Sequence, residues 1–321
     1  MTQDSDRRLG YLIAAASACV WSATSPGIAF LLSRNVPSLT IALWRDIVIA
    51  SFMIATLALA RPLLLQINAR ALRELFIAGA ISIGLYHALW VWSVRLNGVA
   101  VAVVLIYLYP AFVTLGAWAL FKERIGAPQV VALALAMTGC ALVVRAYDPT
   151  LVQFSLPGLV IGLLTAITHS FYVLFNQHRV QRGNRTTRLH PLTSLTYTMT
   201  FGAVTLFFLT LLASPAQLKP PAEPTAMLAL IALALGPTMG GYALFTVALR
   251  HAPARIASLI VVMEVPIATL IAVAFLGERL EWPQVAGMIF ILTAAVLPGV
   301  HAELAAQRDA RVTASLAPAP K

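Results

Sequence analysis

Long runs of apolar residues, separated by short polar connections, make up most of the 321-residue chain. A helix needs about 20 apolar residues to cross the hydrocarbon layer of a bilayer. The runs are continuously apolar rather than alternating, so they predict helices and exclude the strands of an outer-membrane barrel. Ten runs are long enough, at about 9–32, 39–60, 72–94, 99–121, 128–144, 157–176, 192–213, 226–249, 256–276 and 283–300.

The two ends of the chain differ in character. Arg7 and Arg8 precede the first run, as in a secretory signal peptide, but this run extends over about 24 residues. The apolar region of a signal peptide has about 7–15 residues, so we expect an uncleaved first transmembrane helix instead. Residues 301–321 are polar and Ala-rich, and predict a disordered cytoplasmic tail.

The chain also contains an internal repeat at an offset of about 155 residues. One copy contains Tyr109-Pro110, Glu123-Arg124 and Pro128-Gln129-Val130, and the other contains Val265-Pro266, Glu278-Arg279 and Pro283-Gln284-Val285. The repeat divides the runs into two five-helix halves, 1–148 and 149–300. Because five is odd, the halves must lie in the membrane with opposite orientations, which is typical of transporters. Duplication for stability alone is the alternative.

Composition supports an all-α polytopic membrane protein of ten transmembrane helices in two inverted repeats. Hydrophobic residues make up 60% of the chain and charged residues 11%, which excludes an ordinary soluble enzyme, a disordered protein and a disulfide scaffold. The two cysteines, Cys19 and Cys140, lie in apolar runs without a metal-binding motif, so we interpret them as packing residues. We expect no metal site and no cofactor.

The net charge of +10 would suggest nucleic-acid binding in a soluble protein. Here it predicts orientation, because Lys and Arg concentrate in cytoplasmic loops. With both termini cytoplasmic, sixteen of the 22 basic residues lie inside and five outside, and Arg45 lies within a span. We therefore expect a multi-pass protein of the bacterial inner (plasma) membrane, with cytoplasmic N- and C-termini and no nucleic-acid partner.

The chain resembles the drug/metabolite transporter superfamily, specifically its EamA-type members. The resemblance rests on the 5+5 repeat, on Glu264-Val265-Pro266 through Leu276-Gly277-Glu278-Arg279, on the following Pro283-Gln284, and on Arg45 in the second span. The resemblance covers residues 10–300, approximately. Within the superfamily, the chain looks most like the bacterial aromatic amino-acid exporters. It implies a proton- or gradient-linked exporter of amino acids and related metabolites.

Charged side chains within a membrane span are costly and therefore mark functional candidates. Arg45, Asp46 and Glu264 are the three that lie well inside the predicted spans. Arg45 either recognises a substrate carboxylate, or has a structural role in which it reaches the outer interface or pairs with a backbone or carboxylate partner. As neighbours on a helix, Arg45 and Asp46 should point about 100° apart. Glu264, close to Pro266, either binds an ammonium group or a proton, or hydrogen-bonds a neighbouring helix.

Histidine and aromatic residues complete the predicted binding site. His87 and His169 lie within spans, where they can exchange protons or simply link helices. Stacking and cation–π contacts suit an aromatic amino acid, whereas lipid contact is the alternative for these rings. The predicted substrate-binding residues are Trp21, Tyr86, His87, Trp90, Tyr107, His169, Tyr172, Tyr242 and Glu264.

Glycine and proline mark possible breaks in the helices. Pro110, Gly236, Pro237, Gly240, Gly241 and Pro266 are the predicted helix-break or gating positions, and Gly79 and Gly84 form a milder counterpart in the first half. The glycines of the third span and the Gly/Pro run of the eighth span lie at corresponding places in the two halves. This correspondence predicts a site between the third and eighth spans. Tight helix packing at small residues is the alternative.

The resulting hypothesis is an exporter of amino acids, preferably aromatic or hydrophobic, working by alternating access. Export of drugs or other small metabolites is the alternative within the class, and a passive channel is the alternative from another class. No catalytic residues are expected, because an enzyme would need a cluster of acidic and His side chains or a Ser-based dyad. The expected partners are the substrate, the lipid bilayer and, as a coupling ion, protons, with the chain acting as a monomer.

Overall fold

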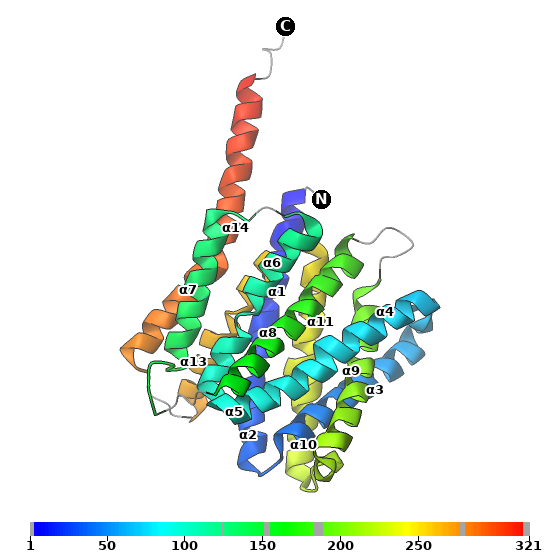
Figure 1. Cartoon of the computed structure of the whole chain (residues 1–321). Coiled ribbons are helices and arrows are strands. Elements are labelled where there is room, and N and C mark those ends of the chain that lie inside the picture. The colour runs from blue at the N-terminus through cyan, green and yellow to red at the C-terminus, as the bar shows by residue number, and fades with distance from the viewer. Residues whose placement is uncertain (1–2, 124, 151–154, 183–188, 277–279, 317–321) are drawn as a thin grey trace.

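The computed structural model describes residues 3–123, 125–150, 155–182, 189–276 and 280–316, and the regular structure in these ranges is helical throughout (Figure 1). The α-helices are α1 (Gln3–Trp21), α2 (Thr24–Ser33), α3 (Ser38–Ala60), α4 (Ala69–Gly79), α5 (Tyr86–Ile106), α6 (Tyr109–Phe121), α7 (Ala127–Val143), α8 (Leu156–Asn176), α9 (Pro191–Ala213), α10 (Pro224–Leu233), α11 (Met239–His251), α12 (Ala254–Val261), α13 (Glu264–Leu276) and α14 (Trp282–Leu316). Arg124 and 277–279, which belong to the predicted repeat, lie outside the described residues.

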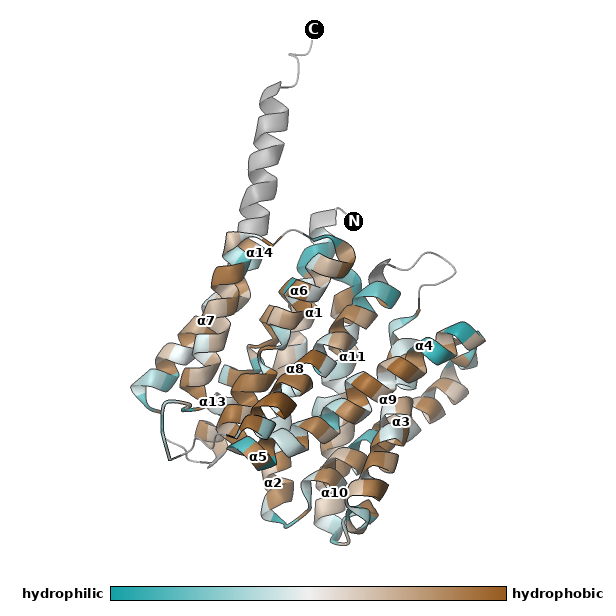
Figure 2. Ribbon diagram, viewed as in Figure 1, coloured by the Kyte–Doolittle hydropathy of each residue, from teal (hydrophilic) through white to brown (hydrophobic). Residues whose placement is uncertain are grey.

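Many of these helices suit a membrane. Seven helical segments are long and apolar enough to cross one: Ser5–Ser33, Ser38–Ala60, Ala69–Ile106, Leu156–Val180, Pro191–Ala213, Pro224–His251 and Ala254–Phe275. Three shorter apolar helices, Tyr109–Phe121, Ala127–Val143 and Trp282–Pro298, accompany them. Hydrophobic residues occur along almost every helix of the bundle (Figure 2), and many of them are exposed, with Leu59 and Phe275 more than 80% exposed. An exposed apolar surface of this extent is typical of contact with lipid.

We name the two ends of the bundle by the chain segments that lie there. The N-terminal face carries the start of α1, the end of α6, the start of α7 and the end of α11, and it is the upper face in Figure 1. The opposite face carries residues 34–37 and 214–223.

A glycine turn joins the predicted third and fourth spans. The helical segment Ala69–Ile106 is too long for a single span, and Gly98 within it has φ 73° and ψ 168°. Only glycine adopts this region readily, because it has no Cβ. Two successive spans therefore meet there without a loop.

Three predicted spans are divided in the middle. The first separates at Ser22-Ala23 into α1 and α2, the fourth at Tyr107-Leu108 into α5 and α6, and the ninth at Val262-Met263 into α12 and α13. The helix that follows each break has proline at its second or third residue, namely Pro26, Pro110 and Pro266. Proline is compatible with a first helical turn but removes a hydrogen bond from a helix interior, so it restarts the helix here.

The same order of local elements occurs twice. A 3₁₀-helix follows α3 at Pro62–Leu65 and another follows α9 at Pro215–Leu218. A π-helical turn joins α4 to α5 at Ala80–Leu85, and another joins α10 to α11 at Ala234–Thr238. Gly236 and Pro237 therefore widen the helix rather than break it, because the π-helical turn keeps the chain helical where proline cannot donate.

Reciprocal hydrogen bonds relate the two halves. The Thr40 hydroxyl donates to the Gln217 carbonyl (2.8 Å), and the Thr193 hydroxyl donates to the Leu64 carbonyl (2.9 Å). In the same way, Trp44 Nε1 donates to Leu218 O (3.0 Å) and Tyr197 donates to Leu65 O (2.6 Å). Each second-half residue exceeds its first-half counterpart by 153 in number. Such mutual exchange is typical of a two-fold relation between surfaces.

Helix packing follows the same exchange. Helix α1 packs on α11 as α8 packs on α5, while α3 pairs with α9 and α7 with α14. Helices α7 and α14 meet at Gly139 and Gly287, where a Cβ on either glycine would lie 2.6 Å from the other's carbonyl oxygen. A small-residue contact of this kind is common between membrane helices.

The C-terminal segment differs from the prediction. Helix α14 continues to Leu316, whereas residues 301–321 were expected to be disordered. The physical reason is local composition, because Ala, Leu, Glu, Gln and Arg favour helix at low entropic cost. Residues 317–321 lie outside the described residues.

Candidate functional site

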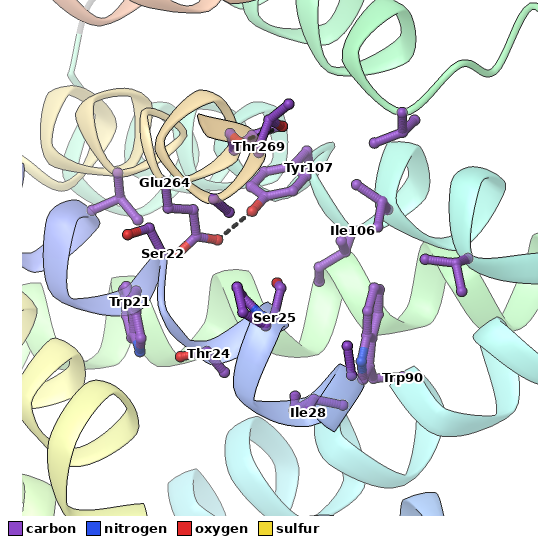
Figure 3. Close-up of a pocket in the computed structure, with 18 of the residues that line it drawn as sticks. Trp21, Ser22, Thr24, Ser25, Ile28, Trp90, Ile106, Tyr107, Glu264 and Thr269 are labelled. Atoms are coloured by element: carbon purple, nitrogen blue, oxygen red, sulfur yellow. Dashed lines mark hydrogen bonds between the residues drawn. The ribbon is translucent and has the colours of Figure 1, made fainter. Parts of the chain in front are cut away.

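A cavity of about 470 Å³ lies among the broken helices (Figure 3). Eight of the nine predicted substrate-binding residues line it: Trp21, Tyr86, His87, Trp90, Tyr107, His169, Tyr242 and Glu264. Arg45 also lines it, and apolar side chains such as Ile28, Val103 and Ile106 complete the wall. Ligand sites are typically cavities of roughly 300–1,000 Å³ with apolar walls and few polar groups.

Glu264 and Tyr107 connect the two halves at the centre of the cavity. Glu264 is the first residue of α13, directly after one helix break, and Tyr107 lies in another. The Tyr107 hydroxyl donates a short hydrogen bond to Glu264 Oε1, drawn as the dashed line in Figure 3. A carboxylate at a helix N-terminus is stabilised by the exposed backbone N–H groups there. The break that follows from Pro266 thus places Glu264 at a helix start, not in a helix interior as its sequence position suggests.

A buried charged triad lies at the other side of the cavity. Arg45 Nη2 lies 2.9 Å from His87 Nε2, and His87 Nδ1 lies 2.6 Å from Asp46 Oδ2. Asp46 is fully buried and Arg45 is only 6% exposed. Arg45 and Asp46 leave the helix in different directions, as expected for neighbouring residues. The long Arg45 side chain nevertheless reaches the His87 imidazole that Asp46 also contacts. Arg45 therefore faces the cavity and does not extend to the outer interface.

Aromatic pairs flank the cavity in a repeated arrangement. The Trp21 ring meets Tyr242 edge-on with centroids 4.8 Å apart, and the His169 ring lies 4.7 Å from Tyr86. Tyr86 and Tyr242 are separated by 156 positions, the same offset as Pro110 and Pro266 in the sequence repeat. His169 also meets Tyr109 at 4.6 Å, and Tyr109 donates to the Ser258 carbonyl (3.0 Å).

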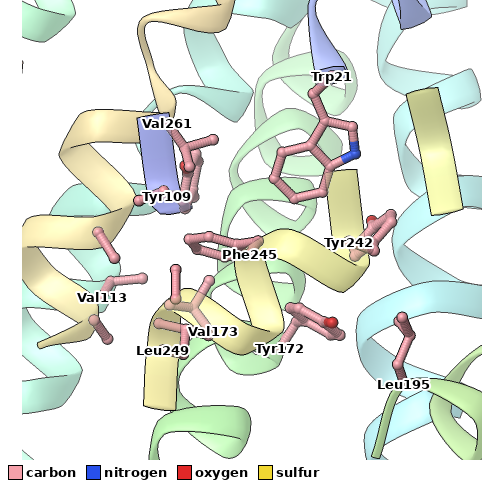
Figure 4. Packing of buried hydrophobic residues seen from close by; sticks show 14 of the residues in the cluster. Trp21, Tyr109, Val113, Tyr172, Val173, Leu195, Tyr242, Phe245, Leu249 and Val261 are labelled. Carbon is pink, nitrogen blue, oxygen red and sulfur yellow. The ribbon is translucent and has the colours of Figure 1, made fainter. Parts of the chain in front are cut away.

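Tyr172 lies outside the cavity wall. It is fully buried among Val173, Phe245 and Leu249 (Figure 4), and its hydroxyl lies 2.5 Å from the Thr246 hydroxyl. Tyr172 follows His169 on α8 by about one helical turn. This apolar cluster separates the cavity from the N-terminal face.

The cavity extends toward the opposite face instead. Val143 at the end of α7, Gln284 at the start of α14 and Ala272 on α13 all line it. Each of these residues lies near the end of its helix that reaches the opposite face. The structure therefore represents a state in which the cavity is closed toward the N-terminal face.

Ion pairs between the halves differ in burial at the two faces. At the N-terminal face, Arg255 Nε lies 2.9 Å from Glu123 Oε2 and Arg179 Nη1 lies 3.1 Å from Glu74 Oε2. We call these four residues the buried latch, because their side chains are at most 27% exposed. At the opposite face, the pairs Arg34–Glu223 and Arg145–Glu281 have side chains that are at least 40% exposed.

Four of the six predicted break positions lie at irregular points of the helices, and two lie inside a regular helix. Pro110 and Pro266 follow breaks, and Gly236 and Pro237 lie in a π-helical turn. Gly240 and Gly241 lie inside regular α11, so they are not breaks. A Cβ on Gly240 would meet Val20 at 3.2 Å, and one on Gly241 would overlap Trp21. These two glycines are required for close packing of α1, the alternative that the sequence left open.

Several polar residues of the cavity were missed at the level of sequence. Ser22, Thr24, Ser25, Thr238, Thr269 and Gln284 also line it. The first three belong to the interruption before Pro26, and a small polar run ahead of proline is a detectable break signal. Within the described part of the chain, no group of three or more His, Cys, Asp or Glu side chains is placed to hold a metal ion.

Comparison with known proteins identifies a family. The model of the EamA-like transporter family matches residues 8–145 and, separately, residues 156–298. No curated protein matches the chain. A solved structure titled only "Crystal structure of protein" is 17% identical, with a TM-score of 0.75 over 92% of this chain and 97% of that chain. At this identity the likeness shows a shared fold alone.

Proposed function

Because this chain belongs to the EamA-like transporter family, whose members are multi-pass proteins that move small molecules across membranes, we propose that it exports amino acids by alternating access. The preferred substrates are aromatic or hydrophobic. The observation that carries the proposal is that one aromatic-walled cavity presents both a cation, Arg45, and an anion, Glu264. An amino acid is a zwitterion with an apolar side chain, so it complements all three features.

Each part of the substrate has a matching group in the wall. The Arg45 guanidinium suits a carboxylate, which it can bind through two N–H groups. Glu264 suits the ammonium group, and Trp21, Tyr86 and Trp90 suit an aromatic ring through stacking. A drug or another metabolite without an ammonium group would leave the Glu264 carboxylate without an opposite charge, which is costly in a dry site.

We also propose ten spans in two inverted halves, with the N-terminal face in the cytoplasm of a bacterium. The reciprocal hydrogen bonds, the repeated order of elements and the two matches of one family model support the inverted halves. The concentration of Lys and Arg in the loops of the N-terminal face supports the orientation. In this orientation the cavity is open to the outside.

Counterflow of labelled amino acids in liposomes tests the substrate. Liposomes that contain the purified protein are loaded with each of the twenty unlabelled amino acids in turn, and entry of the labelled amino acid is measured with and without a proton gradient. We expect transient accumulation of labelled phenylalanine, tyrosine or tryptophan, which a passive channel cannot produce. Absence of flux for every amino acid would refute the substrate assignment and favour another small metabolite.

The Glu264→Gln variant tests the cavity. We expect at least a tenfold loss of amino-acid counterflow with an unchanged melting temperature, because the amide keeps a hydrogen bond to Tyr107 but cannot neutralise an ammonium group. Glu223→Gln is the matched control, since its carboxylate is exposed at the opposite face and such pairs contribute at most about 1 kcal/mol. Wild-type counterflow by Glu264→Gln would remove this residue from the mechanism.

A further inference from the structure

We propose that His87 controls Arg45: neutral His87 holds the guanidinium by a hydrogen bond, and protonation of His87 releases it to bind the substrate carboxylate. His87 is thus a positioning residue, linking a proton to substrate recognition. The inference rests on the proposed function, because it takes Arg45 as the carboxylate-binding group.

The geometry of the triad determines where the imidazole proton lies. A guanidinium carries only donors, so His87 Nε2, at 2.9 Å from Arg45 Nη2, must be the acceptor and carry no proton. The proton of the neutral ring is therefore on Nδ1, which donates to Asp46 Oδ2 at 2.6 Å. Carboxylate contact of this kind fixes the tautomer and orientation of a histidine.

Adding a proton to Nε2 turns this contact into a clash of donors. Both Nε2–H and Nη2–H would then point at each other, with two positive charges in a buried site. Asp46 continues to accept from Nδ1 and keeps the ring in place, so the guanidinium, at the end of a long side chain, is the group that must move. Arg45 already lines the cavity, and a movement away from His87 takes it further into that space.

The charge balance favours a carboxylate as the next ligand. With neutral His87, Arg45 and Asp46 cancel; with protonated His87 the triad carries one uncompensated positive charge. Uncompensated charge in a low-dielectric site is strongly unfavourable, and an entering carboxylate removes it. The bound proton and the bound carboxylate therefore stabilise each other.

Other titratable groups surround the triad from the neighbouring elements. Tyr86 lies beside His87 on α5, with ring centroids 4.9 Å apart, and His169 of α8 lies behind Tyr86. Tyr242 of α11 and Glu264 of α13 line the same cavity. The sequences of α7, α9 and the π-helical turn Ala80–Leu85 contain no Asp, Glu, Lys, Arg or His, with Cys140 and Tyr197 as their titratable residues. Besides His87, Glu264 and His169 are thus the carboxyl and imidazole groups of the cavity wall whose titration a ligand would sense.

Two probe ligands separate the effects of His87 and Glu264. Phenylalanine carries both a carboxylate and an ammonium group, whereas phenethylamine carries the ammonium group alone. Binding of each to the purified full-length protein is measured by calorimetry from mildly alkaline to mildly acidic pH. As the pH falls, we expect the affinity for phenylalanine to rise relative to the affinity for phenethylamine. For one linked proton the rise is up to about tenfold per pH unit.

Two variants identify the residues responsible. His87→Asn keeps an N–H for Asp46 but has no titratable nitrogen facing Arg45, so the difference in pH dependence between the two ligands should disappear while phenylalanine still binds. Arg45→Gln should lose phenylalanine affinity at every pH and retain phenethylamine affinity. If His87→Asn is folded and keeps the wild-type pH difference, or if the wild type shows none, the inference is wrong.

A measurement without substrate separates this inference from the proposed function. Nitrogen NMR of labelled histidine reports the Nδ1–H tautomer of His87 at neutral pH and its protonation in acid, and the Arg45 guanidinium signal should change in the same step. If no amino acid binds but the two signals change together, the proposed function fails and the His87–Arg45 linkage stands. If Arg45 does not respond to His87 protonation, the linkage itself is refuted.

Discussion

At the scale of single residues, the cavity depends on contacts between residues far apart in the chain. Tyr107 and Glu264 are 157 positions apart and each lies at a helix break, yet they share a hydrogen bond. Arg45 and Asp46 are adjacent and meet the same imidazole from two sides. The free energy of such groups is set by their partners, because an unpartnered polar group away from water costs about 1–3 kcal/mol.

The Tyr107→Phe variant tests the central contact. It removes the donor to Glu264 and leaves the carboxylate with one partner fewer, so we expect amino-acid affinity to change by about five- to tenfold and stability to fall by about 1 kcal/mol. Binding calorimetry and thermal unfolding in detergent measure both. Tyr197→Phe is the control, because it removes a hydrogen bond to Leu65 at the N-terminal face and should lower stability alone. Equal affinity changes in both variants would contradict a role for Tyr107 in the cavity.

At the scale of elements, the two π-helical turns are alike in backbone, but a glycine in each has different surroundings. A Cβ on Gly84, in the first turn, would lie 2.7 Å from the Gly202 carbonyl oxygen of α9. A Cβ on Gly236, in the second turn, would meet nothing within 4 Å. Gly84 is thus packed closely against α9, whereas Gly236 has open space beside it.

The different surroundings of Gly84 and Gly236 predict different results for the same Gly→Ala substitution. Gly84→Ala should destabilise the protein by about 1–3 kcal/mol, because backbone atoms cannot move aside easily. Gly236→Ala should leave stability unchanged or raise it slightly, since alanine restricts the unfolded chain and meets no neighbour. Denaturation of the two variants side by side checks this. Equal losses of stability would show that Gly236 is packed as closely as Gly84.

At the scale of the whole molecule, the cavity is closed toward the N-terminal face by the apolar cluster around Phe245 and by the buried latch. The latch joins the halves through Glu123–Arg255 and Glu74–Arg179. The pairs at the opposite face are more exposed and therefore contribute less. We expect the latch to bias the equilibrium between the two access states.

Glu123→Gln tests this bias. Loss of one partly buried charge should shift the equilibrium by about 1 kcal/mol, or about fivefold, toward the state open at the N-terminal face. Modification of Leu249→Cys by a membrane-impermeant thiol reagent, in a background without Cys19 and Cys140, measures access from that face. Glu281→Gln, at the opposite face, is the matched control. A labelling rate that rises equally in both variants would contradict a specific role of the latch.

The amino-acid sequence by itself determined the helical class, the apolar runs, the family and eight of the residues that line the cavity. These properties depend on hydropathy, proline and repeated motifs, which act over short stretches of chain. The tertiary structure alone decided that Tyr172 lies in the core, that Gly240 and Gly241 pack against α1, and that Arg45 and Asp46 converge on His87. It also decided which face of the cavity is closed. These outcomes depend on how distant helices pack, because the free energy of a polar or small side chain in a membrane is set by the neighbour that it meets.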